Sequence, residues 1–191
     1  MEVAGILGGM TLLAVIIVVW AISIYNRLVS MRNLKEEGWS GIDVQLKRRH
    51  DLIGNLVNTV KGYMQHERGV LEDVTRMRAS AQQAGGMAAG VTGVAAAELG
   101  LNQALGRLFA VMENYPALKA SENAMQLQEA LSALEHDLQM ARRYYNGTVR
   151  DLNILIQSFP ASIVARRYAF KEGEFFELDS VAERAVPQVS L

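Results

Sequence analysis

The three histidines are the residues best suited to bind a metal ion in this chain, but none of them has the spacing of a metal site. A di-metal site in a helical bundle uses Glu-x-x-His pairs, which project both ligands inward from one turn. The residues three positions before the histidines are instead Lys47, Tyr63 and Ala133. His66 has no second histidine four residues later, which excludes the common zinc-protease helix. The chain also lacks cysteine, so we expect no metal and no cofactor.

Two glycine-containing motifs fail the tests for nucleophilic and phosphate chemistry. The run Gly38-Trp39-Ser40-Gly41 lacks the second glycine at the offset of a nucleophile elbow, and no strand precedes it. The glycine-rich segment 85–93 is not followed by Lys-Ser or Lys-Thr, as a phosphate-binding loop would be. We therefore predict that the protein is not an enzyme.

A basic run, Lys47-Arg48-Arg49, is a candidate interaction patch for lipid headgroups or for the acidic surface of a partner. Along a straight helix it lies roughly 30 Å beyond the apolar N-terminal segment, which is too far for much attraction to the same bilayer. The favoured interpretation is therefore structural, with a solvated face and with Arg49 in a salt bridge inside the bundle.

The apolar N-terminal segment contains a spacing that permits close contact between helices. Gly5 and Gly9 form a Gly-x-x-x-Gly pattern, and Ala4 with Gly8 repeats the small-residue spacing. We hypothesise that the protein is a homo-oligomer assembled through this segment, alone or together with the long helix that follows it.

Composition and charge exclude further classes of function. The 191 residues carry a formal net charge of −1, which lacks the basic footprint of a nucleic-acid binder. Residues 27–191 contain 19 basic and 19 acidic side chains, so this part is neutral by itself. Half of all residues are apolar, and the excess is concentrated at the N-terminus.

Residues 1–26 are interpreted as a transmembrane anchor in contact with the lipid bilayer. No charged residue occurs between Val3 and Asn26, and a helix of that length reaches about 36 Å, enough to cross a hydrocarbon core of roughly 30 Å. A cleaved signal peptide is the alternative, but it would have a basic start, whereas Glu2 is the only charged residue before the apolar run. Arg27, Arg32 and Lys35 follow the span, so the positive-inside rule predicts a single-pass protein with its N-terminus outside.

Apolar residues spaced by alternating steps of three and four predict an all-α protein, with the spanning helix continuing into a long antiparallel helical bundle. The first stripe continues from Trp39 to Met77 without an obvious break. Glu67 occupies a core position in this stripe, and we expect it to pair with an arginine of another helix, either of the same chain, which is favoured, or of another subunit.

Breaks in the pattern predict three long helices plus a short fourth. We expect a loop over 84–93, a second helix over 95–114, and a third that Pro116 opens and Phe159-Pro160 closes, with Tyr145 in its core stripe. The short helix covers 161–168. The predicted organisation is thus an anchor over 1–26, a bundle over 27–168 and an acidic-aromatic segment over 169–191, whose last dozen residues are expected to be flexible.

Several long motifs resemble the bacterial LemA family. They include Gly38-Trp39-Ser40-Gly41-Ile42-Asp43-Val44-Gln45-Leu46-Lys47-Arg48-Arg49-His50-Asp51-Leu52-Ile53, then Tyr115-Pro116-Ala117-Leu118-Lys119-Ala120, Ala141-Arg142-Arg143-Tyr144-Tyr145-Asn146, and Phe159-Pro160 followed by Phe175-Phe176. Two positions depart from the family pattern: Gly38 stands where Ala is usual, and Gly54 where Pro is usual. The resemblance implies a single membrane anchor followed by a helical bundle, and no established catalytic activity.

Two classes of function are compatible with these features. The first is a non-enzymatic, membrane-anchored scaffold that self-associates and takes part in envelope or membrane organisation, with its bundle on the cytoplasmic side of a bacterial inner membrane. The alternative is a tethered adaptor or receptor that binds one protein partner, such as a membrane protease or a signalling component. A scaffold should form large particles when purified alone, whereas an adaptor should stay small until its partner is added.

Overall fold

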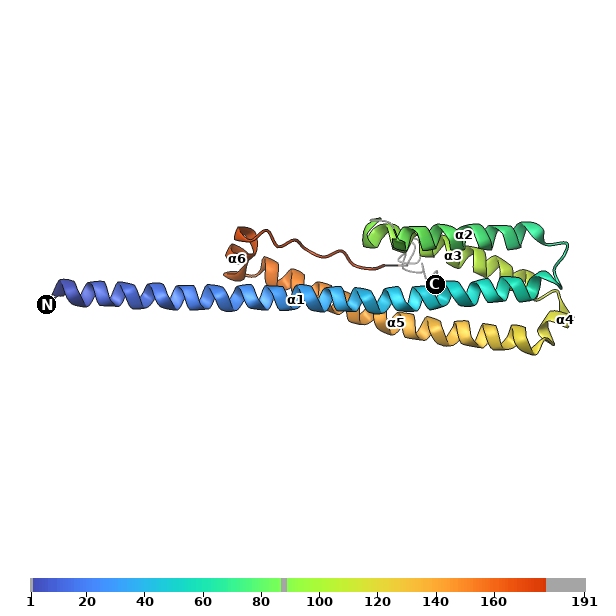
Figure 1. The fold of residues 1–191 in the computed structure, drawn as a ribbon, viewed down its shortest axis with the longest axis horizontal. Helices are drawn as coiled ribbons and strands as arrows, with labels where there is room; N and C mark the ends of the chain where they lie inside the picture. The colour runs from blue at the N-terminus through green and yellow to red at the C-terminus, as the bar shows by residue number, and fades with distance from the viewer. Residues whose placement is uncertain (1, 87–88, 178–191) are drawn as a thin grey trace, which may run out of the picture. The chain divides into compact units, whose positions relative to one another are not determined.

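The computed structural model describes residues 2–86 and 89–177 of the chain. Within these residues the protein forms six helices and no strand, which confirms the predicted all-α class (Figure 1). The helices are α1 (Glu2–Lys61), α2 (Arg68–Gly86), α3 (Gly90–Met112), α4 (Pro116–Lys119), α5 (Glu122–Gln157) and α6 (Ala161–Arg167).

Contacts divide the chain into two compact units, and each unit combines segments distant in sequence. Unit 1 comprises Met1–Trp39 and Tyr144–Gly173, and unit 2 comprises Ser40–Arg143 and Glu174–Leu191. Residues 178–191, which include most of the predicted C-terminal segment, lie outside the described part of the chain.

Unit 2 is built from the last third of α1, from α2, α3 and α4, and from the first part of α5. Helices α2 and α3 lie side by side as a hairpin (Figure 1). Apolar stripes of all these helices meet in one core, because each stripe repeats every three or four residues and so faces one side. The core contains Ile53, Leu56, Val60, Met64, Leu71, Val74, Ala81, Leu101, Ala104, Leu105, Leu108, Met112, Leu118, Ala124 and Leu131.

The prediction of an unbroken first bundle helix through Met77 is wrong. Helix α1 ends at Lys61, and six residues connect it to α2 at Arg68. The apolar pattern did not indicate this turn, because Met64 follows Val60 at the spacing of a helix. Met64 lies in the turn, and its side chain is fully buried in the core. The amide N–H groups of Tyr63 and Met64 both donate to the carbonyl of Val60 at 3.0 Å, which closes the end of α1.

Two other boundaries also differ from the sequence-based expectation. The glycine-rich region is partly helical, because α2 extends to Gly86 and α3 already begins at Gly90. Val94 is buried in α3, so this early turn packs apolar surface that offsets the low helix propensity of its glycines. Pro116 opens the separate short helix α4 rather than the third long helix, and α5 begins only at Glu122.

Unit 1 joins the first part of α1 to the second part of α5 and to α6, which lies alongside α1 in Figure 1. Leu28 of α1, Leu152 of α5, and Val164 and Ala165 of α6 form its buried core. Tyr145 is buried, as its place in the stripe predicts, and its ring lies 5.4 Å from that of Trp39.

Helix α6 ends in a Schellman motif, which reverses the chain. Ala169 adopts a left-handed φ of 55°, its N–H donates to the carbonyl of Arg166, and the N–H of Phe170 donates to the carbonyl of Ala165. These two bonds satisfy carbonyls that a helix end otherwise leaves free. The turn brings Phe170 onto the unit 1 core, where it packs with the apolar side chains.

The N-terminal part of α1 is apolar and uncovered. Of the described helices, α1 alone is long and apolar enough to cross a membrane, as judged by length and composition. Its most apolar window has a mean hydropathy of 2.5 and no buried residue. Large side chains from Ile6 to Ile22 remain exposed, as expected for a surface that faces lipid.

Candidate functional site

Five polar side chains meet inside unit 2, and we call them the Arg49 network. They are Arg49 and His50 of α1, Glu98 and Asn102 of α3, and Glu135 of α5. The guanidinium of Arg49 lies 2.7 Å from Glu98 Oε2 and 2.6 Å from Glu135 Oε1. It also donates to the side-chain oxygen of Asn102. The network therefore links three helices through one side chain.

Glu98 is the centre of the network and is fully buried. Its second carboxylate oxygen, Oε1, lies 2.6 Å from Nε2 of His50, so both oxygens have a partner. A buried carboxylate without partners would be strongly unfavourable, and an arginine on one oxygen with an imidazole on the other compensates for its desolvation. The arrangement is consistent with a structural lock that holds α1 and α3 in one register.

Sequence reasoning did not identify Glu98, although a signal was present. Val94, Leu101 and Leu105 are spaced around Glu98 by four, three and seven residues, so they share its helix face. All three are buried. A glutamate on such an apolar face predicts a buried ionic partner, and Arg49 supplies it.

A second contact secures the backbone of α1 next to the network. Nε of Arg78, on α2, donates to the backbone carbonyl of His50 at 2.6 Å. A β-carbon added at Gly54 would meet Arg78 Cζ at 2.9 Å. The glycine at this position thus leaves room for the guanidinium against the surface of α1.

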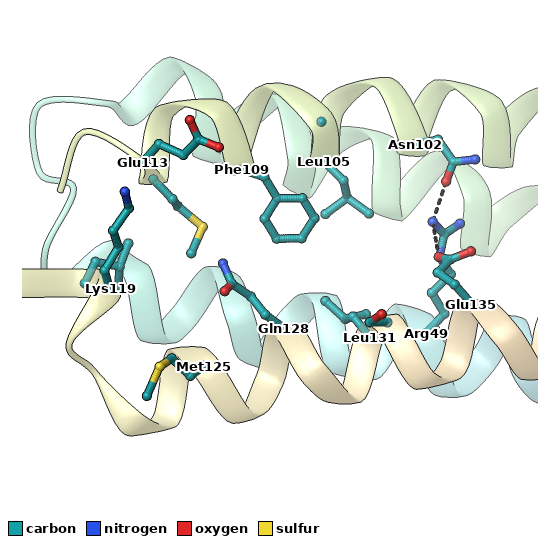
Figure 2. Close-up of a pocket in the computed structure, with 14 residues that line it drawn as sticks. Arg49, Asn102, Leu105, Phe109, Glu113, Lys119, Met125, Gln128, Leu131 and Glu135 are labelled. Carbon is teal, nitrogen blue, oxygen red and sulfur yellow. Dashed lines mark hydrogen bonds and ion pairs between the residues drawn. The ribbon is translucent and has the colours of Figure 1, made fainter. Parts of the chain in front are cut away.

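An open groove of about 770 Å³ adjoins the Arg49 network in unit 2. Figure 2 shows Arg49, Asn102 and Glu135 at one end of it and Glu113 with Lys119 at the other. The lining between these ends is mainly apolar and comes from α3, α4 and α5; it includes Leu105, Phe109, Met112, Leu118, Met125 and Leu131. Such a groove can bind an apolar segment through its walls and orient it through its charged ends.

The structure separates the three residues of the predicted basic patch. Lys47 and Arg48 are exposed, whereas Arg49 is buried and bound to carboxylates. Arg49 therefore belongs to the interior of the bundle, as the structural interpretation holds. Lys47 and Arg48 remain the surface part of the candidate patch.

Gly5 and Gly9 both lie in α1. Apart from its chain neighbours and the nearby backbone of α1 itself, a β-carbon added at Gly9 would meet no described atom within 4 Å. The backbone around Gly9 is thus open to another molecule.

The favoured pairing of Glu67, with an arginine of the same chain, is wrong. Glu67 lies in the turn before α2, and its Oε1 accepts a hydrogen bond of 3.2 Å from the hydroxyl of Tyr115 rather than from an arginine. Burial, followed by the charge of Glu67, raises the pKa of Tyr115 above its ordinary value of 10.0. The break between α1 and α2 moved Glu67 out of the register that the unbroken stripe implied.

A second charged cluster lies on the surface between α2 and α3. Asp73 accepts hydrogen bonds from Arg107 of α3 and Arg76 of α2. The hydrogen bond from Arg107, above all, lowers the pKa of Asp73 below its ordinary value of 3.8. In the residues that the structure describes, no group of three or more histidine and carboxylate side chains is placed to hold a metal ion.

Comparison with known proteins gives matches over most of the chain. The sequence model of the LemA family matches residues 38–191. Magnetosome proteins MamQ 2 and MamQ 1 of Paramagnetospirillum magneticum are each 26% identical to the chain, over 80% of it and 64% of their own length. Magnetosome protein MamQ of Magnetospirillum gryphiswaldense is 25% identical over the same shares. The chain therefore spans somewhat less than two thirds of the length of these relatives.

Proposed function

The chain belongs to the LemA family, and from this premise we propose that it is a membrane-anchored helical scaffold that self-associates and helps to organise a bacterial membrane. The observation that carries this proposal is the continuity of α1. One helix contains both the uncovered apolar segment and the residues that build the bundle core. A bilayer would cover the first part, while the second part would present helical surface to other molecules.

The internal construction of unit 2 supports a structural rather than a catalytic role. Both carboxylate oxygens of Glu98 are bound, one by Arg49 and the other by His50, so neither is free to bind a substrate. A fixed bundle of this kind suits a protein whose surfaces act by binding. The relatives named as magnetosome proteins are consistent with a role at a membrane.

Self-association is proposed through the anchor, because Gly9 is open and forms the Gly-x-x-x-Gly spacing with Gly5. Glycines at this spacing let two helix backbones approach closely. Replacing both residues with isoleucine would hold the backbones apart. We therefore expect the Gly5→Ile, Gly9→Ile double variant to form smaller assemblies than the wild type.

Native mass measurement of the full-length protein in lipid nanodiscs and mild detergent tests the proposal. A scaffold gives homomeric particles of several copies, and the double variant shifts them to smaller masses. A matched Ala14→Ile variant places its added side chain on the opposite side of the helix from Gly5 and Gly9, and we expect it to reduce assembly less. A monomeric wild type would overturn self-association, whereas large particles unchanged in the double variant would overturn the role of the anchor in it.

The second candidate function is a tethered adaptor, and the groove beside the Arg49 network is the observation that favours it. An apolar surface with Arg49 and Glu135 at one end and Lys119 at the other could receive a segment of a partner protein. For an adaptor we expect a monomer alone and a defined complex when the partner is present. Cross-linking from a photoreactive residue at Gln128, in the groove, against one at Glu129, on the exposed face, would distinguish specific capture from random contact.

We propose that the bundle lies on the cytoplasmic side of a bacterial inner membrane, since Arg27, Arg32 and Lys35 follow the apolar segment. Fusion of alkaline phosphatase after Leu191 tests this orientation in cells. Low phosphatase activity at normal expression supports it, and high activity overturns it.

A further inference from the structure

The corner between α5 and α6 exposes large apolar side chains to solvent. Phe159 is 82% exposed, and Ile163, four residues later on α6, is 55% exposed. Tyr168, directly after α6, is 59% exposed, and Ile154 near the end of α5 is 54% exposed. We call these four residues the corner patch. On the buried side of α6, Val164 and Ala165 pack into the core of unit 1. This packing fixes the position of α6 and leaves its other side exposed.

The packing of unit 1 determines where along α1 this corner lies. The core formed by Leu28, Val164 and Ala165 is joined by Ala21 and Ile24 of α1. These α1 residues occupy the last turns of the uncharged run, which ends at Asn26. Helix α6 therefore lies beside the end of the apolar segment, at the level where a spanning helix passes from hydrocarbon to headgroups.

Aromatic rings gather at this same level. The ring of Tyr25 lies 4.8 Å from that of Tyr168 and 5.8 Å from that of Phe170, both in edge-to-face geometry. Trp20 precedes Tyr25 by five residues on α1. Tyrosine and tryptophan favour the membrane boundary, because their rings are apolar and carry a polar group that remains hydrated.

Cationic side chains accompany the rings. Arg166 and Arg167 follow Ile163 by three and four residues, so they share its exposed side of α6. The guanidinium of Arg167 lies 5.9 Å from the ring centre of Tyr168, and that of Arg32 lies 5.6 Å from Phe170. Arg27 is also exposed at the end of the apolar run. This combination of apolar, aromatic and cationic groups matches an anionic lipid surface.

We propose that the corner patch is a second membrane contact, which inserts into the boundary of the same bilayer that the apolar part of α1 crosses, with Arg166 and Arg167 on the lipid phosphates. The proposal rests on the membrane anchoring proposed above. We assign a lipid surface rather than a protein to this patch for two reasons. The patch lies beside the end of the uncovered apolar segment of α1, and it carries cationic side chains. Unit 1 is then attached to the bilayer at two points, and α1 cannot rotate freely about its own axis.

The absence of cysteine allows a direct test on the full-length protein. Single variants Phe159→Cys and Ile163→Cys are labelled with a nitroxide and reconstituted in vesicles of phosphatidylethanolamine and anionic phosphatidylglycerol. Oxygen, which concentrates in lipid, and a water-soluble nickel complex are used as relaxation agents. We expect both labels to be more accessible to oxygen and more shielded from nickel than a label at Tyr144, an exposed apolar residue of α5 in the same unit.

A label at Ile16, in the apolar segment, separates the two proposals. A lipid-exposed label at Ile16 with water-exposed labels at Phe159 and Ile163 overturns the second contact and leaves the anchor intact. A water-exposed label at Ile16 overturns the anchor, and with it the second contact. Labels at Phe159 and Ile163 shielded from both agents would show coverage by protein, which also overturns the proposal. All labelled positions are exposed, so the variants should fold, and circular dichroism checks this.

Discussion

In unit 2, α1, α3 and α5 are joined by the charged and polar side chains of the Arg49 network, whereas in unit 1 α1, α5 and α6 are joined by apolar and aromatic groups. Glu98 is fully buried, with Arg49 on one carboxylate oxygen and His50 on the other. The ion pair described within unit 1 links the neighbouring residues Arg150 and Asp151 on the surface. The same two long helices, α1 and α5, thus take part in two different kinds of packing along their length.

The difference follows from the surroundings proposed for each unit. A buried carboxylate pairs well in only one register, because a shift of one helical turn between α1 and α3 would separate Glu98 from Arg49 and His50. Apolar and aromatic contacts tolerate small shifts more easily. Next to a bilayer, charged side chains between the helices would lose hydration both to the protein and to the lipid. Apolar contacts between the helices therefore have the lower free energy there.

The largest effect is expected from Glu98→Ala, which leaves Arg49 and His50 buried without their shared partner. Removing one member of a buried ion pair costs about 3–5 kcal/mol of the free energy of unfolding. Urea unfolding of the full-length protein, followed by circular dichroism, measures this loss, and hydrogen exchange should place it in α3. Glu129→Ala, an exposed glutamate of α5, is the control, and an equal loss there would contradict the special role of Glu98.

Leu28→Ala tests the apolar packing of unit 1 in the same way. Leu28 is fully buried against α5 and α6, so its truncation leaves a cavity that costs about 3 kcal/mol. Hydrogen exchange should increase in α6 and leave α3 protected. Leu28→Met conserves volume, and its cost should stay below about 1.5 kcal/mol; loosening of α3 by Leu28→Ala would show that the two units are not energetically distinct.

Gly38→Ala sharpens the comparison by overpacking unit 1. A β-carbon at this position would meet the backbone Cα of Tyr145 at 3.1 Å, so α1 and α5 must move apart. We expect a loss of about 1–2 kcal/mol. Gly41→Ala is the matched control, since its β-carbon would meet nothing within 4 Å, and better helix propensity should stabilise it by up to about 1 kcal/mol. Effects of equal sign would contradict the close approach at Gly38.

The smallest effect is a pH dependence in unit 2. The pKa of Asp73 is lowered in the folded protein, so its stabilising contribution is present above its ordinary value of 3.8 and is lost as the pH falls through the folded value. Thermal unfolding between pH 7 and pH 3 should therefore fall less steeply with acid for Asp73→Asn than for the wild type. Identical slopes would show that the hydrogen bond from Arg107 contributes little.

The predictable features of the fold were those that follow from the sequence pattern within a single helix. The stripe of α5 indicated the burial of Tyr145, and Phe159-Pro160 indicated the end of that helix. Arg49 was expected in a salt bridge inside the bundle, as the alternative to a basic interaction patch. Each of these inferences uses residues close together in sequence, where helix geometry alone determines which side chains share a face.

The features that sequence reasoning missed depend on contacts between distant segments. Met64 follows Val60 at the spacing of a helix although it lies in a turn. The sequence pattern is therefore the same for a continuous helix and for a turn that places Met64 in the core. Glu98 lies 49 residues from Arg49, and no local pattern names one as the partner of the other. The corner patch consists of exposed apolar residues whose meaning comes from the level of α1 beside which α6 packs.

Because Leu28 is buried against Leu152 and Val164, the core of unit 1 cannot form until α5 and α6 have been synthesised. More than 120 residues separate Leu28 from these partners in the chain. At roughly 5–20 residues per second, about 6–25 s pass between the synthesis of Leu28 and that of the helices that cover it. During this time the apolar segment can already enter the bilayer, so the lipid boundary is the first surface available to the uncovered face of α1. Helix α6 would then displace lipid, not water, when it arrives.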